Sequence, residues 1–242
     1  MITKKEVNKM KEKRIWVLVA LFAAVLVLTP ACSEGVSHQE NNTWVEEPDA
    51  DEDLSDVEER DDVICGESED RIRLSSDIEA LAGCDIYRGT IDFAYFRSAG
   101  EEFSFSEILP PLRGIEGTLN IFHVFYLQTL KGLESLEYVG ELNIRSQVDL
   151  RDISALANLE EVGEWLHISG NPALLSLHGL ENVHTVGRLS ITHNDSLQSL
   201  DGLAGLERVY GDLTIRSNSG LSSAEIEAFV DRLDVDGAIQ IE

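Results

Sequence analysis

The sequence predicts a mainly β protein, a parallel solenoid of about seven leucine-rich coils with a short capping helix at each end. A Gly-x-Leu-x-Ile pattern recurs seven times, at spacings of 28, 23, 24, 23, 24 and 26 residues. Spaced leucines follow each segment, and an Asn recurs two residues after three of them. Repeats of about 20–29 residues with this pattern are typical of leucine-rich solenoids, in which each coil contributes one strand.

The N-terminus has the features of a targeting segment. Residues 1–14 contain six Lys or Arg, and residues 15–28 are 14 consecutive apolar residues. This combination predicts a signal peptide over residues 1–31. The following Leu-Thr-Pro-Ala-Cys run resembles a bacterial lipobox, which implies that Cys32 becomes the lipidated first residue of the mature protein. Cleavage after Ala31 that leaves a free thiol, and an uncleaved anchor, are the alternatives.

An acidic stretch separates this segment from the repeats. Residues 33–62 contain 13 acidic residues and one basic residue. Such a composition predicts a disordered tether over residues 32–62, beginning at the lipidated Cys32. The whole chain has a formal net charge of −26. A surface of this kind repels phosphate backbones, so nucleic acid is not expected as a partner.

The first folded element is expected near two cysteines. Ser76 and Glu79 have the spacing of a helix capping box, and Gly83 is suited to end that helix. If Cys32 carries lipid, Cys65 and Cys84 remain as the pair for one disulfide in an exported protein. The bridge would hold the N-terminal helix across the first coil.

The coils then follow in order, and their first aliphatic positions align. These positions are Ile91, Leu119, Leu142, Leu166, Leu189, Leu213 and Ile239. Gln147, Asn171, Asn194 and Asn218 recur just beyond the strands, where stacked amides are expected to satisfy the backbone groups of a tight corner. A second helix is expected to start at Ser222, with Ile226, Phe229, Val230 and Leu233 on one face.

These features together resemble the receptor L-domain family. The resemblance rests on Cys65, the capping helix, the segment Gly83-Cys84-Asp85-Ile86-Tyr87-Arg88-Gly89-Thr90-Ile91 and the coils that follow, and it covers residues 63–242. It implies a right-handed β-solenoid, an extracytoplasmic location and a recognition or structural role. A single L domain without a cysteine-rich module does not carry over the two-lobed ligand clamp of the receptors.

A candidate ligand face lies on the outward side of the predicted sheet. Alternation along the strands places Phe122, Arg145, Trp165 and His167 outward on three adjacent strands. Aromatic residues and Arg are the usual anchors of binding patches. The extra residue before Leu166 predicts a bulge that re-aims Trp165. The alternatives are an ordinary exposed sheet, a Trp165 that turns inward, and binding by the aromatic loop 95–105.

The expected function is non-catalytic. The sequence contains no phosphate loop, zinc-ligand spacing or nucleophile elbow, so no catalytic, cofactor-binding or metal residue is assigned. We expect a lipid-anchored protein of the bacterial envelope, on the periplasmic or surface-facing side of the outer membrane, that recognises a protein or a glycan. A structural envelope component without a specific ligand is the main alternative, and a polysaccharide-active enzyme is less favoured.

Overall fold

The computed structural model describes residues 62–73, 78–95 and 103–242. The chain divides into two compact units, Met1–Val57 and Glu58–Glu242, and all described residues belong to the second. Several predictions lie outside the described residues. They are the signal peptide, the lipidation of Cys32, the tether apart from its last residue, the helix start at Ser76 and most of the loop 95–105.

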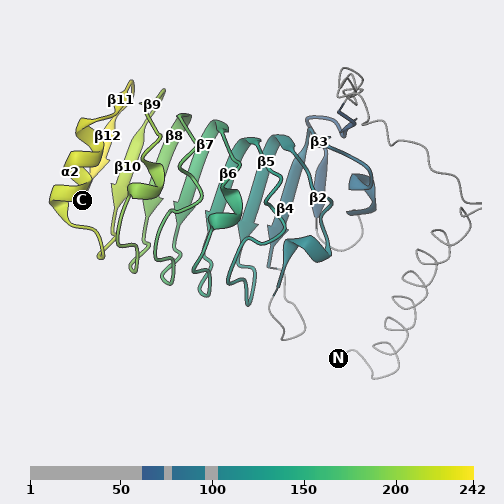
Figure 1. Cartoon of the computed structure of the whole chain (residues 1–242), viewed down its shortest axis with the longest axis horizontal. Coiled ribbons are helices and arrows are strands. Elements are labelled where there is room, and N and C mark those ends of the chain that lie inside the picture. The colour runs from purple at the N-terminus through teal and green to yellow at the C-terminus, as the bar shows by residue number, and fades with distance from the viewer. Residues whose placement is uncertain (1–61, 74–77, 96–102) are drawn as a thin grey trace, which may run out of the picture. The chain divides into compact units, whose positions relative to one another are not determined.

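The described part of the chain is mainly β, with one twelve-stranded parallel sheet and one α-helix (Figure 1). The main strand order is β1-β3-β5-β6-β7-β8-β10-β12, while β2 pairs with β4 beside β5, and β9 lies between β8 and β11. The strands are β1 (Ile64–Cys65), β2 (Arg71–Arg73), β3 (Ile86–Tyr87), β4 (Thr90–Ala94), β5 (Gly114–Phe122), β6 (Tyr138–Arg145), β7 (Glu161–Ser169), β8 (Thr185–Thr192), β9 (Arg208–Val209), β10 (Leu213–Arg216), β11 (Asp234–Val235) and β12 (Ile239–Ile241).

The strand register confirms the alignment of the repeats. Each predicted first aliphatic residue lies directly beside the next one, from Ile91 beside Leu119 to Leu213 beside Ile239. The structure adds an eighth member, Ile72, which pairs with Ile91. All members of this column are buried except Ile239, which is 47% exposed at the end of the sheet.

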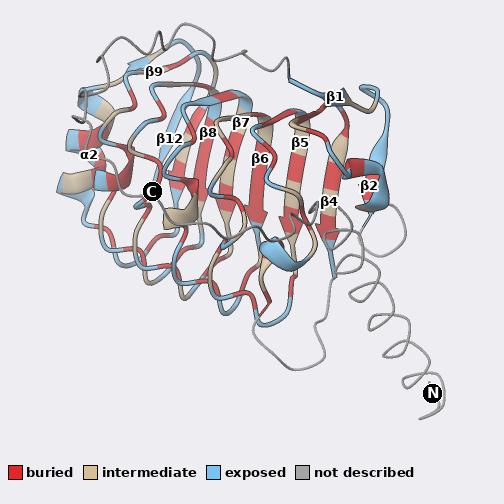
Figure 2. Cartoon of the chain, turned by 45° about the vertical axis from the view of Figure 1, so that its right-hand side comes forward, coloured by how far each residue is buried: buried red, intermediate tan, exposed pale blue. Residues whose placement is uncertain are grey.

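A continuous apolar interior lies between the strands and the segments that return to the next strand. Rows of buried residues run along both (Figure 2). In one return segment, Leu174, Leu177 and Leu180 are completely buried. Burying one such side chain contributes about 1.5–3 kcal/mol, so each repeat gains its stability by covering its neighbours.

The predicted amide ladder is present. The backbone N–H of Gln147 donates to Asn171 Oδ1 at 3.0 Å, and the N–H of Asn171 donates to Asn194 Oδ1 at 3.1 Å. Asn194 continues the ladder by donating from its N–H to Asn218 Oδ1 at 2.9 Å. The side chains of Gln147, Asn171 and Asn194 are completely buried. They therefore satisfy backbone groups that the corner would otherwise leave unpaired in the interior.

The long strands β5, β6, β7 and β8 each contain a glycine near their start, and at most of these positions the chain passes very close to the neighbouring strand. A Cβ atom on Gly187 would lie 2.2 Å from the carbonyl oxygen of Glu164. A Cβ on Gly117 would lie 2.3 Å from the carbonyl oxygen of Gly89. Gly163 differs, because the atom nearest to its Cβ would be 3.6 Å away. Gly163 lies in β7, which has one more residue at this point than β6 and β8 have.

The helical elements are short. The α-helix α2 (Ser223–Asp231) begins after Ser222, as predicted, and the Ser222 hydroxyl accepts from the N–H of Glu225. Ile226 and Phe229 are its buried residues. The remaining helical elements among the described residues are the 3₁₀ turns η2 (Ile78–Leu81), η3 (Phe105–Glu107), η4 (Ser154–Leu156) and η5 (Asp201–Leu203). The predicted N-terminal helix is thus represented among the described residues by a single 3₁₀ turn.

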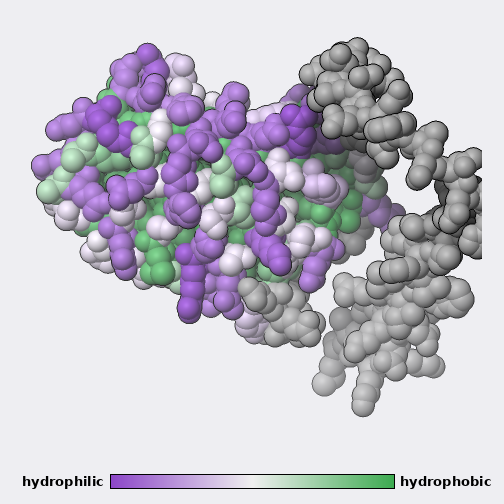
Figure 3. Space-filling model, viewed as in Figure 1, coloured by the Kyte–Doolittle hydropathy of each residue, from purple (hydrophilic) through white to green (hydrophobic). Residues whose placement is uncertain are grey.

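The predicted disulfide between Cys65 and Cys84 is confirmed, with the two Cα atoms 5.8 Å apart. It joins β1 to the turn after η2. Within the described ranges, the helices are all too short or too polar to cross a membrane. Hydrophilic residues cover most of the face seen in Figure 3, and hydrophobic residues show between them.

Candidate functional site

The four predicted face residues lie on three adjacent strands. Phe122 of β5 pairs with Arg145 of β6, while Trp165 and His167 lie on β7 beside Glu141 and Asn143 of β6. Arg145 is exposed, and the two aromatic residues and His167 are partly buried. None of the four belongs to the apolar core. Trp165 therefore does not turn inward.

The four residues form two clusters. The Arg145 guanidinium carbon lies 5.6 Å from the centre of the Phe122 ring. The rings of Trp165 and His167 stack with centres 4.7 Å apart and an angle of 8° between their planes. Tyr95, which is not among the predicted face residues, extends the first cluster, with its ring 5.2 Å from that of Phe122.

A bulge in β7 sets the position of Trp165. Val139 of β6 lies beside Val162, but Glu141 lies beside Trp165, so β7 contains one more residue over this interval than β6 does. The same offset occurs against β8, where Trp165 lies beside Arg188. The predicted bulge is therefore present, and the room beside Gly163 occurs at the same place.

His167 is neutral at neutral pH. Its pKa is lowered from 6.5 to about 4, first because burial disfavours the charged ring, and second because of the positive charge of Arg145. Glu141 acts in the opposite direction. The buried Nδ1 atom of His167 has no hydrogen-bond partner in the described part of the chain. The ring thus supports the indole of Trp165 without adding a charge to the face.

A groove adjoins Trp165 on the outer side of the sheet. Its volume is about 610 Å³, and it is lined by Glu141, Gly163, Glu164, Trp165, Gly187, Arg188, Tyr210 and Gly211. Trp165 is its only residue from the predicted set. Tyr210 is 57% exposed, and the Arg208 guanidinium carbon lies 5.0 Å from the centre of its ring. One sequence signal marks Tyr210, namely that it is an extra residue between the last buried valine, Val209, and the corner glycine.

The arginines on this face differ from most others. Neither Arg145 nor Arg188 forms an ion pair within the described residues, whereas five arginines elsewhere are paired with carboxylates: Arg71, Arg88, Arg113, Arg208 and Arg216. Glu141 is held in place by the Thr118 hydroxyl at 3.2 Å and the Asn143 amide at 3.0 Å. The groove thus combines an oriented carboxylate with a guanidinium that has no acidic partner.

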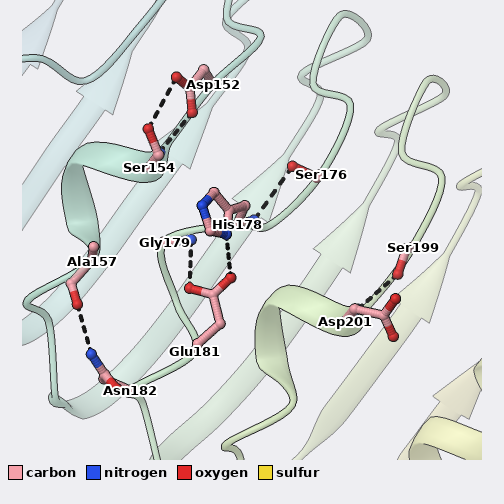
Figure 4. A network of polar contacts seen from close by, with 10 residues as sticks. All are labelled: Asp152, Ser154, Ala157, Ser176, His178, Gly179, Glu181, Asn182, Ser199 and Asp201. Atoms are coloured by element: carbon pink, nitrogen blue, oxygen red, sulfur yellow. Dashed lines mark hydrogen bonds and ion pairs between the residues drawn. The ribbon is translucent and has the colours of Figure 1, made fainter.

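The opposite side of the molecule carries a different polar network (Figure 4). In four return segments a short side chain accepts from a backbone N–H two residues later, as Asp152 does from Ser154 at 2.8 Å and Ser199 from Asp201 at 2.9 Å. His178 is paired with Glu181. Within the described ranges, no three His, Cys, Asp or Glu residues lie close enough together to hold a metal ion. These contacts stabilise the turns of the return segments.

No protein-family model matches the chain. No curated protein and no solved structure is significantly similar to it.

Proposed function

We propose that the chain is a lipid-anchored protein of the bacterial envelope that presents a single L-domain-like solenoid for non-catalytic recognition of a protein or a glycan. The solenoid would be right-handed, with about seven coils and with α2 covering its C-terminal end. The aligned aliphatic column and the continuous amide ladder support this architecture. The disulfide near β1 supports export to an oxidising compartment.

The observation that carries the recognition role is the group of aromatic and unpaired basic side chains on the outer face of β5, β6, β7 and β8. In a chain with 45 acidic and 19 basic residues, Arg145 and Arg188 both lie on this face without an ion pair among the described residues. Aromatic side chains and Arg dominate the binding energy of many recognition surfaces. Nothing in the apolar packing requires Trp165 or Arg145 to occupy this face.

The test is capture of partners from native envelope extracts by the full mature protein. Trp165→Ala and Arg145→Ala should each reduce capture by about thirtyfold, the loss expected for a binding anchor, and leave the melting temperature of Arg145→Ala unchanged. Arg151→Ala, an exposed arginine in a return segment, is the matched control. Unchanged capture by both face variants would contradict recognition through this face and favour the loop 95–105 or a purely structural role.

Anchoring is tested separately at Cys32. The residue follows an apolar run and a small residue, as in lipidated precursors. Cys32→Ser should release the protein from membranes or leave its precursor uncleaved. Mass spectrometry of the wild-type N-terminus should find a lipid on Cys32, and an unmodified thiol there would exclude the anchor without affecting the binding face.

A further inference from the structure

We propose that the groove between Trp165, Arg188 and Tyr210 binds a short stretch of an uncharged glycan. This inference rests on the proposed recognition function and assigns it a ligand class and a place. The groove volume of about 610 Å³ falls within the range of about 300–1,000 Å³ typical of sites that enclose a small ligand. The site differs from the predicted face because it excludes Phe122, Arg145 and His167.

The aromatic residues give the groove flat apolar surfaces. His167 covers one face of the Trp165 ring and does not line the groove, so the groove meets the rest of the indole. Tyr210 adds a second ring, which is fixed by Arg208. Arg208 is itself fixed by Asp234 at 2.8 Å and Asp236 at 2.9 Å. The C–H faces of sugar rings are apolar and flat, and preorganised aromatic rings bind such surfaces with little loss of side-chain freedom.

The polar residues match hydroxyl groups better than charges. A hydroxyl both donates and accepts, so neighbouring sugar hydroxyls are satisfied by a guanidinium that donates and a carboxylate that accepts. Arg188 has no ion-pair partner among the described residues, and Glu141 is already oriented by Thr118 and Asn143. Glu164 is exposed at the same groove. Both kinds of hydrogen-bonding group are therefore present beside the aromatic rings.

Charge argues against an anionic glycan, which would approach a chain of net charge −26 and meet two glutamates in the groove. The two glutamates would attract a basic peptide, but its cationic groups would also meet the guanidinium of Arg188, directly beside Trp165 in the adjacent strand. An uncharged glycan can use the donor and the acceptors of the groove together, and it is the ligand that we assign to it.

The floor of the groove is formed by glycine. Gly187 and Gly211 line it, and the close approach of neighbouring backbone keeps side chains out of both positions. A ligand can thus reach the backbone between the two rings. The bulge in β7 contributes Gly163 and Glu164 at the same level. The groove is a product of the bulge and the glycine corners together.

The test is binding of the full mature protein to oligosaccharides by calorimetry. The probes are neutral cello-, xylo-, manno- and chito-oligosaccharides, with oligogalacturonate as the anionic probe and oligolysine as the cationic one. We expect a neutral oligosaccharide to bind with an affinity that hardly changes between low and high salt, because no net charge is involved. Binding of oligogalacturonate or oligolysine alone, with a strong dependence on salt, would overturn the proposal, as would a lack of binding to all four neutral probes.

Variants locate the site. Tyr210→Ala and Arg188→Ala should each lower the affinity for the neutral oligosaccharide about tenfold or more, with an unchanged melting temperature because both side chains are exposed. Arg151→Ala, an exposed arginine in a return segment away from this face, should bind like the wild type. Equal losses for Arg151→Ala and Arg188→Ala would refute the assigned place. If partner capture from envelopes depends on Arg145 while no sugar binds, the recognition function stands and the glycan inference fails.

Discussion

At the residue scale, His167 lies on the outer face of the sheet, and its protonation affects the free energy of unfolding. Its ring stacks on Trp165 and lies close enough to Arg145 for that charge to lower its pKa. The side chain is therefore held neutral in the folded state, while in the unfolded chain it protonates with a pKa near 6.5. The difference makes the stability of the protein depend on pH in a predictable direction.

The folded protein should lose stability as the pH falls from about 6.5 to about 4, because the unfolded chain then binds a proton at His167 that the folded chain does not. We expect a loss of about 1–3 kcal/mol from this residue, after allowing for its partial exposure. Urea unfolding across this pH range should show a shallower decline for His167→Phe than for the wild type. Identical declines would mean that His167 protonates equally in both states.

The buried amides give a second prediction at this scale. Asn194 accepts from the N–H of Asn171 and donates to the carbonyl oxygen of Ile168. Asn194→Ala would leave both backbone groups unsatisfied in the interior, at a cost of about 2–4 kcal/mol. The control is Asn158→Ala, which removes an exposed amide bonded to the Glu134 carbonyl and should change unfolding by less than about 1 kcal/mol. Equal losses of unfolding free energy for the two variants would show that the buried ladder amide stabilises the protein no more than the exposed amide does.

At the scale of the element, the strands differ in how closely they approach one another at their glycines. β5, β6, β7 and β8 continue through the corner, whereas the chain is split into β9 and β10 around Tyr210. Where a strand contains a bulge or an extra residue, its side chains can project from the sheet. The groove occurs at such a place, between the bulge of β7 and the extra residue Tyr210.

The same Gly→Ala substitution should therefore affect stability differently at two of these glycines. Gly187→Ala forces a Cβ atom against the Glu164 carbonyl oxygen and should cost about 1–3 kcal/mol. Gly163→Ala has room, so it should be neutral or stabilise the protein by up to about 1 kcal/mol through the unfolded state. Thermal unfolding of the two variants distinguishes these outcomes. A large loss for Gly163→Ala would contradict the open geometry of the bulge.

At the scale of the whole molecule, the aliphatic column and the amide ladder could be predicted from spacing, because the same constraint acts in each repeat. The disulfide could be predicted from the cysteine count, and α2 from its capping serine and the spacing of its apolar residues. Ile72 was missed because no Gly-x-Leu-x-Ile pattern surrounds it. The groove at Arg188 and Tyr210 was missed because it arises from side chains of separate strands, whose relative offset depends on the bulge. The stacking of Trp165 on His167 was likewise missed, because it depends on the side-chain rotamers of both residues, which the spacing of residues in the sequence does not determine.

The disulfide gives a prediction at this scale. Cys65 and Cys84 are 19 residues apart in sequence, and closing such a loop stabilises the folded state by about 3 kcal/mol in the chain-entropy model. Cys84→Ser should lower the urea midpoint accordingly and increase hydrogen exchange at β1 and β3, with β7 and β8 less affected. Uniform exchange throughout the sheet would show instead that the bridge stabilises the molecule as one cooperative unit.

The amide ladder has a direction. Each buried N–H is bonded by a side chain that lies 23 or 24 residues later, and the same side chain donates back to an earlier strand, as Asn171 does to Ile144. In a polypeptide that emerges from the ribosome with its N-terminus first, the last corner formed therefore always has a backbone N–H without its side-chain acceptor. That N–H is bonded only when about one further repeat has appeared. The buried N–H groups thus acquire their acceptors in the order of synthesis, and a chain stopped early leaves one of them unbonded wherever it stops.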